Sequence, residues 1–283
     1  MDTPQQPPPS SPQQPSQPGP PWVEAYLGRI GARHPAAPDA AALRELHVRH
    51  LLTVPFENLA IHLGEDIVLA EKPLVDKIVG ARRGGFCYEL NGAFAALLRA
   101  LGFSVTLLQA RVHGADGGLG IPYDHLVLRV GTADGTGPWL ADIGFGDHSH
   151  HPLDLAAQGE QQDPGGAFRI QEAPDGDFDV VRDGKPQYRV DPRSRELADF
   201  EAGAWYHRTS PDSHFTRSLI CSRLSEQGRI TLSGGRLLTT AQGEKHATEL
   251  DTDERVLAAY RDNFGIALDR VPVLRAFPRD SAG

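Results

Sequence analysis

Residues 82–92 read Arg-Arg-Gly-Gly-Phe-Cys-Tyr-Glu-Leu-Asn-Gly and contain Cys87, one of only two cysteines in the chain. The two glycines let other groups approach the backbone just before the sulfur. Apolar residues follow at helical spacing up to Gly102, which predicts a helix that begins near Cys87. These residues are Leu90, Phe94, Leu97, Leu98 and Leu101. A thiol in the first turn lies at the positive end of the helix dipole, so the segment predicts a nucleophile. The alternative is a small buried apolar side chain.

Two residues farther along the chain favour the nucleophile. His125 opens a strand-like alternation, and Asp142 ends a short apolar run. A thiol, an imidazole and a carboxylate in this order are typical of a Cys–His–Asp relay, in which the base takes or shares the thiol proton and the acid orients the base. We therefore predict Cys87, His125 and Asp142 as the catalytic residues.

Five sequence blocks resemble the signature of the arylamine N-acetyltransferase family. RGGFCYELN, DHL and ADIGFGD stand in the family's order, with PFENL (55–59) upstream and SHFT (213–216) downstream. The resemblance runs from about Trp22 to about Leu268. It implies an α+β fold with a cysteine-protease-like Cys-His-Asp core. Its expected parts are an N-terminal helical bundle (22–105) that carries the nucleophile, an antiparallel β-barrel (106–210) that carries His125 and Asp142, and a C-terminal α/β lid (211–283).

The hydrophobic pattern by itself also indicates an α+β chain. It predicts helices from Trp22 to Gly31, after Asp39, over 75–81 and after Thr252. It predicts strands over 103–112, 123–130 and 138–143, short strands within 168–190, a core strand at Cys221, and a hairpin whose turn is Gly234-Gly235. His47 and His50 are expected to be packed or on the surface, not metal ligands.

Composition excludes several functional classes. The net charge of −9 without a basic stripe argues against nucleic acid and anionic membranes as partners. Two distant cysteines fit a reducing cytoplasm, and no apolar run reaches the length of a membrane span. Residues 1–21 hold nine Pro, five Gln and three Ser and are expected to form a disordered tail.

The resemblance implies ligand roles for residues outside the triad. Phe56, Val112 and Phe145 would line an aromatic acceptor pocket. Gly146 would let the arm of acetyl-CoA, the expected co-substrate, approach the backbone, the alternative being a plain turn glycine. Glu57 is a candidate partner of Arg83, the alternative being a surface carboxylate. The sequence does not locate the partners of the CoA phosphates, for which the candidates are Arg208, Arg217, Arg229 and Arg236.

No metal site is expected. The run Asp147-His148-Ser149-His150-His151 does not match the ligand spacing of a common zinc site. A surface loop is the prediction for these residues.

The resulting hypothesis is ping-pong transfer of an acetyl group from acetyl-CoA to an arylamine or arylhydrazine through an acetyl-cysteine. An amide synthase that releases a polyketide as a macrolactam on the same fold is one alternative, and a binding protein without turnover is another. Oligomeric state does not follow from the sequence.

Overall fold

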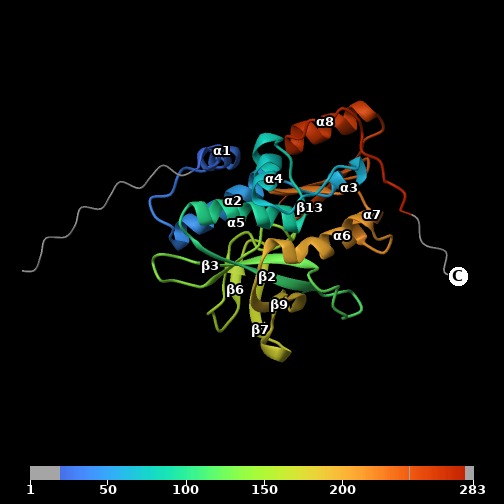
Figure 1. Cartoon of the computed structure of the whole chain (residues 1–283). Coiled ribbons are helices and arrows are strands. Elements are labelled where there is room, and N and C mark those ends of the chain that lie inside the picture. The colour runs from blue at the N-terminus through green and yellow to red at the C-terminus, as the bar shows by residue number, and fades with distance from the viewer. Residues whose placement is uncertain (1–19, 242, 278–283) are drawn as a thin grey trace, which may run out of the picture.

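The computed structural model describes residues 20–241 and 243–277. The fold is α+β, with helices first, an eight-stranded antiparallel sheet next, and a five-stranded sheet with a final helix at the end. Figure 1 shows the strands of the large sheet below helices α2 and α5, with α8 at the opposite side of the molecule.

The N-terminal helices follow the caps that the sequence provides. Their bounds are Pro21–Ile30 (α1), Ala40–Thr53 (α2), Leu59–Leu63 (α3), Glu71–Val75 (α4) and Cys87–Ala100 (α5). Gly31 ends α1 with a φ of 67°, and the Asp39 side chain caps α2 by accepting from the backbone N–H of Ala42 at 2.8 Å. The prediction for 75–81 is only partly right, because the α-helix begins at Glu71 and Asp76–Gly80 is π-helical.

The large sheet forms a nearly closed barrel. Its strand order is β5-β4-β3-β2-β9-β8-β7-β6. The strands are Ser104–Val112 (β2), His125–Gly131 (β3), Trp139–Ala141 (β4), Leu153–Asp154 (β5), Gln161–Asp163 (β6), Gly166–Glu172 (β7), Phe178–Arg182 (β8) and Lys185–Arg195 (β9). Side chains join its two edge strands: the Gln161 amide donates to the carbonyl of Asp154 at 2.9 Å and accepts from its N–H at 2.7 Å. These bonds satisfy edge groups that would otherwise stay unpaired.

The second sheet combines C-terminal strands with a strand from the helical part. Its order is β1-β10-β11-β12-β13. The strands are Phe56–Glu57 (β1), Cys221–Ser225 (β10), Gly228–Ser233 (β11), Arg236–Ala241 (β12) and Glu244–Glu249 (β13). The predicted hairpin at Gly234-Gly235 and the buried position of Cys221 are confirmed. The sequence analysis missed β13, whose residues are all exposed and carry no apolar alternation.

Two short helices connect the barrel to this sheet. They are Glu201–Thr209 (α6) and His214–Arg217 (α7), and the final helix is Asp253–Phe264 (α8), capped by Thr252 as predicted. Among the described residues, no helix combines the length and the apolar character that crossing a bilayer requires. The predicted tail at 1–21 lies, except for its last two residues, outside the described residues.

Candidate active site

Cys87 is the first residue of α5, and close backbone packing holds it there. Phe86 precedes it in an extended conformation, and its N–H donates to the Glu89 side chain at 3.2 Å, as in a capping box. A Cβ at Gly85 would lie 2.6 Å from Glu89 Oε2, and one at Gly84 would lie 1.9 Å from a backbone carbonyl oxygen of the neighbouring segment. Both positions therefore require glycine, and the two glycines fix the entry into the helix.

The barrel brings His125 and Asp142 together. His125 begins β3 and Asp142 follows β4, and these strands pair antiparallel, with Leu128 opposite Ala141. The Nε2 atom of His125 lies 2.8 Å from Oδ2 of Asp142, and both side chains are buried. This leaves Nδ1 of His125 for the sulfur of Cys87, which lines the same cavity and interacts with the ring closely enough to raise the pKa of His125. The structure thus places the three predicted catalytic residues in contact.

Asn91 holds the carboxylate of Asp142, and the sequence analysis did not single it out. Its Nδ2 atom donates to Oδ1 of Asp142 at 2.9 Å, and its Oδ1 atom accepts from the N–H of Ile143 at 3.0 Å. The N–H of Gly144 adds a third donor to Asp142 at 3.0 Å. The spacing could have indicated it, because Asn91 lies four residues after Cys87 and therefore on the same face of the helix.

The electrostatics of the site favour a charged imidazolium on His125 and a charged carboxylate on Asp142. Burial opposes a charged imidazole, but the Asp142 carboxylate and the Cys87 thiol outweigh this and raise the pKa of His125 to about 10. Burial likewise opposes ionisation of Asp142, yet His125, His148 and Asn91 hold the pKa of that carboxyl well below its usual range. The site therefore carries an imidazolium beside the sulfur at neutral pH.

The pKa of His125 predicts that its ring stays protonated over an unusual pH range. An ordinary imidazole loses its proton at about pH 6.5. Here the carboxylate of Asp142 keeps the ring charged until pH rises through about 10. We expect the ring resonances of His125, followed by NMR, to keep the values of an imidazolium between about pH 7 and 9. A titration midpoint of about 6.5 would contradict this.

A buried charge network supports the loop before Cys87. The predicted partnership of Glu57 with Arg83 is confirmed: the guanidinium Nε lies 2.9 Å from Oε1 of Glu57, and a second contact of 2.9 Å reaches Glu65. Lys77 makes a 2.6 Å ion pair with Glu89, the residue that caps α5. Glu57 and Glu89 are both buried, so each carboxylate depends on its cationic partner.

Replacing Arg83 with Met tests this dependence. The change leaves the buried carboxylate of Glu57 without its cation, which typically costs about 3–5 kcal/mol of unfolding free energy. We expect a correspondingly large fall in the urea midpoint. Arg49→Met is a matched control, because Arg49 is exposed and pairs with Glu45 one turn away on the same helix, an interaction of small energy. Equal midpoints for the two variants would contradict the role assigned to Arg83.

A cavity of ≈400 Å³ opens over the thiol. Phe56, Val112 and Phe145, the predicted pocket residues, line it together with Cys87 and His125. The sequence analysis missed Phe215, which also lines it and packs against Phe56 with ring centroids 6.0 Å apart. Asp124, His207 and His214, which the sequence did not predict as site residues, form a polar edge of the same cavity.

A larger cavity of ≈650 Å³ adjoins the first. The two share Phe56, Phe145 and Ile220 as lining residues, and Gly146 lines the larger one. Arg182, Arg229 and Lys245 give this cavity a cationic wall, opposed by Asp147. Of the four arginines expected near phosphates, only Arg229 lines it. Arg208 stacks on Trp205, Arg236 pairs with Glu249, and Arg217 lines a different cavity.

The surface-loop prediction for 147–151 is wrong for His148 and Ser149, which are buried. The ring of His148 packs into the barrel against Phe145, Phe168 and Tyr188, with centroids 4.8–5.3 Å apart. Burial lowers the pKa of His148 to about 4, so the ring is neutral. Within residues 20–241 and 243–277, no group of three or more His, Cys, Asp or Glu is placed to hold a metal ion.

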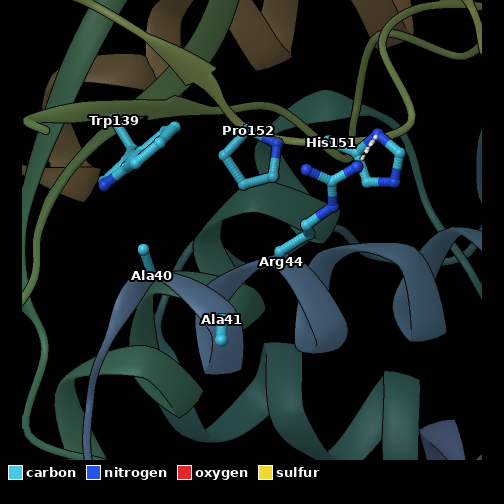
Figure 2. A pocket seen from close by; sticks show the side chains of 6 residues that line it. All are labelled: Ala40, Ala41, Arg44, Trp139, His151 and Pro152. Atoms are coloured by element: carbon cyan, nitrogen blue, oxygen red, sulfur yellow. Dashed lines mark hydrogen bonds between the residues drawn. The ribbon is translucent and has the colours of Figure 1, made fainter. Parts of the chain in front are cut away.

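A separate cavity of ≈250 Å³ lies between the start of α2 and the barrel (Figure 2). Arg44 projects into it beside His151, 3.4 Å away, while Trp139 and Pro152 form the opposite side.

His47, one turn after Arg44, links α2 to the barrel. Its ring accepts from the N–H of Asp142 at 3.2 Å and contacts the carbonyl of His150 at 2.9 Å. The expected packing of His47 and His50 is confirmed, since both are buried.

Known proteins are similar to this chain in sequence and in fold. The N-acetyltransferase family model matches residues 39–273. The Escherichia coli arylamine N-acetyltransferase is 33% identical over 257 residues, covering 88% of this chain and 90% of that protein. The chain belongs to the arylamine N-acetyltransferase family.

Solved structures of arylamine N-acetyltransferases superpose on the fold. The Salmonella typhimurium enzyme gives a TM-score of 0.80 at 32% identity, covering 89% of this chain and 94% of that one. The Mycobacterium marinum enzyme in complex with CoA gives a TM-score of 0.79 at 30% identity, covering 86% and 92%. The resemblance inferred from the five sequence blocks is therefore confirmed.

Proposed function

We propose that this enzyme transfers an acetyl group from acetyl-CoA to the nitrogen of an arylamine or arylhydrazine by a ping-pong mechanism through acetyl-Cys87. The observation that carries the proposal is the contact of His125 with both Cys87 and Asp142 at the floor of an apolar cavity. Family membership supports acetyl transfer to arylamines.

In the first half-reaction the Cys87 thiolate attacks the carbonyl carbon of the thioester. The charge that develops on the carbonyl oxygen needs hydrogen-bond donors, and the backbone N–H of Cys87 at the start of α5 is the natural one. The tetrahedral adduct collapses, the C–S bond to CoA breaks, and His125 supplies the proton to the leaving thiolate. Asp142 stabilises the imidazolium until this transfer and keeps the ring oriented.

In the second half-reaction the amine nitrogen attacks the acetyl carbon on Cys87. Neutral His125 removes a proton from the nitrogen as the C–N bond forms, and the Cys87 thiolate leaves beside the regenerated imidazolium. Phe56, Val112, Phe145 and Phe215 present an apolar wall, which suits an aromatic ring and disfavours water as the competing acceptor.

We place the acetyl-CoA arm along Gly146 and its phosphates in the larger cavity. The shared lining residues make a continuous path from Cys87 to Arg182, Arg229 and Lys245. Gly146 has a φ of 97° and no atom would contact a Cβ there, so its backbone is open to a ligand. Three cations with one carboxylate suit a polyanion.

Arg229→Gln tests this placement. Loss of one phosphate partner should raise the KM for acetyl-CoA about tenfold and leave kcat for the bound complex nearly unchanged. The effect should shrink at high salt, since screening already weakens the contact. Arg236→Gln is the matched control, because Arg236 is exposed and pairs with Glu249 of the neighbouring strand β13, outside the larger cavity. Similar KM values for both variants would show that Arg229 does not bind a phosphate of acetyl-CoA.

Mass spectrometry of the intact protein tests the proposed function directly. After brief exposure to acetyl-CoA, we expect one acetyl adduct, which an aromatic amine discharges with formation of the amide. An adduct that aromatic amines leave intact would favour the amide-synthase alternative or another acceptor. Absence of any adduct with short acyl-CoAs, together with slow alkylation of Cys87, would refute the mechanism.

A further inference from the structure

The cavity over Cys87 continues past its polar edge. A second cavity of ≈440 Å³ adjoins it, and Val112, Asp124, His207 and His214 line both. The rest of its wall comes from the loop between β2 and β3 and from the segment that joins α6 to α7. An acceptor whose reacting nitrogen meets Cys87 therefore has room for a substituent beyond these shared residues.

Asp124 is held rigidly at this boundary. Its Oδ1 atom lies 2.9 Å from Nε2 of His207, and its Oδ2 atom accepts from the N–H of Val112 at 3.0 Å. The Nδ1 atom of His207 lies 3.2 Å from the hydroxyl of Ser213, which in turn accepts from the N–H of Phe215. One chain of hydrogen bonds thus joins the end of β2, the residue before His125, and the α6–α7 segment.

The carboxylate of Asp124 has unused acceptor capacity. An ionised carboxylate offers about four lone-pair positions, and among residues 20–241 and 243–277 two of them are taken, by His207 and Val112. The side chain is 11% exposed, and the residue lines both cavities. A partly buried carboxylate in this setting attracts a hydrogen-bond donor or a cation and repels another carboxylate.

The charges around the second cavity favour the same kind of ligand. Among its described lining residues, Asp116 and Asp124 carry carboxylates and Arg217 carries a guanidinium. The guanidinium of Arg111 lies just outside, where it donates to the carbonyl of Gly120 at 2.7 Å. The carboxylate that both cavities share is that of Asp124, in contrast with the cationic wall of the larger cavity around Arg229.

We propose that Asp124, positioned by His207, determines acceptor specificity by favouring aromatic amines with a cationic or hydrogen-bond-donating side chain over those with a carboxylate. The inference rests on the proposed function, because the acceptor delivers the side chain. It assigns the second cavity as the subsite for the part of the acceptor that lies beyond the aromatic ring.

Three para-substituted anilines with the same two-carbon spacer test the subsite. They are 4-(2-aminoethyl)aniline, 4-propylaniline and 3-(4-aminophenyl)propionate, whose spacer insulates the aryl nitrogen from the charge. We expect the wild type to show a kcat/KM ratio of cation to anion of at least about tenfold, the size of a single partly screened charge contact. The propyl compound should fall between them. A ratio near one or below would overturn the proposal.

Two variants change the ratio in opposite directions. Asp124→Asn keeps the shape and the bond from Val112 but removes the charge, so the ratio should fall about threefold or more. Arg217→Gln removes the opposing cation from the same cavity, so the ratio should rise. Each ratio is taken within one variant, so a general loss of folding or acetylation cancels. A ratio that Asp124→Asn leaves unchanged would show that Asp124 only holds the α6–α7 segment in place.

A binding measurement separates failure of this inference from failure of the proposed function. 2-Phenylethylamine and 3-phenylpropionate lack the aryl nitrogen and need no acetyl transfer. We expect the amine to protect Cys87 from iodoacetamide at a concentration at least about tenfold lower than the acid. Equal protection would refute the subsite even if acetyl transfer is established, and the expected protection would support it even if acetyl-CoA is not the donor.

Discussion

Replacing Cys87 with serine should lower kcat/KM for arylamine acetylation by at least about 10⁴-fold, a loss typical of removing the nucleophile from a catalytic triad. A serine hydroxyl does not ionise beside His125 as a thiol does, so no acyl-enzyme forms at a useful rate. The acetyl adduct seen by mass spectrometry should disappear as well.

Cys221→Ser is the matched control for this variant. Cys221 is the other cysteine of the chain, fully buried in β10, and no part of it lines the cavity over Cys87. We expect this variant to keep the adduct, although a hydroxyl in the apolar core should lower its melting temperature. An adduct that survives in Cys87→Ser and vanishes in Cys221→Ser would show that Cys221, and not Cys87, is the nucleophile.

Asp142→Asn should lower kcat/KM by about 10³–10⁴-fold, as for a triad whose acid becomes an amide. The neutral amide that replaces the carboxylate cannot stabilise an imidazolium, so the pKa of His125 should fall toward its ordinary value. The carboxylate also accepts from Asn91 and Gly144, and an amide nitrogen at either contact would face a donor.

An NMR titration of His125 distinguishes this electrostatic effect from a loss of folding. In Asp142→Asn we expect the ring to titrate near its ordinary pKa, since the carboxylate that keeps it charged to about pH 10 is gone. Circular dichroism should show the same secondary structure for both proteins. A loss in kcat/KM below tenfold, with the high pKa of His125 kept, would show that Asp142 has no role in the mechanism.

The sequence predicted features that depend on residues close together along the chain. The helix behind Cys87, the caps at Asp39 and Thr252, and the turn at Gly234-Gly235 all follow from local periodicity and turn chemistry, and the structure confirms them. The pair of Glu57 with Arg83 was predicted only as a candidate, and the 2.9 Å contact confirms it over the alternative of a surface carboxylate.

The features that the sequence did not predict depend on distant segments. Asp124 and His207 are 83 residues apart and meet because α6 packs against the segment that leads into β3, where Gly203 lies close to the carbonyl of Tyr123. The burial of His148 depends on the barrel that closes around it, since a histidine in a Gly- and His-rich run carries no apolar pattern. Lys77, which pairs with Glu89, lies in a π-helical turn, whereas the hydrophobic periodicity predicted an ordinary α-helix there.

Strand β1 has a consequence for how this protein is made on the ribosome. Phe56 and Glu57 pair with β10 on one side, and Phe56 bridges to Gly85 on the other. The partner strand is translated long after Cys87, so a nascent chain that already contains all three triad residues still lacks the neighbour that fixes β1. We therefore expect the wall of the cleft at Phe56 to form only after β10 has been translated.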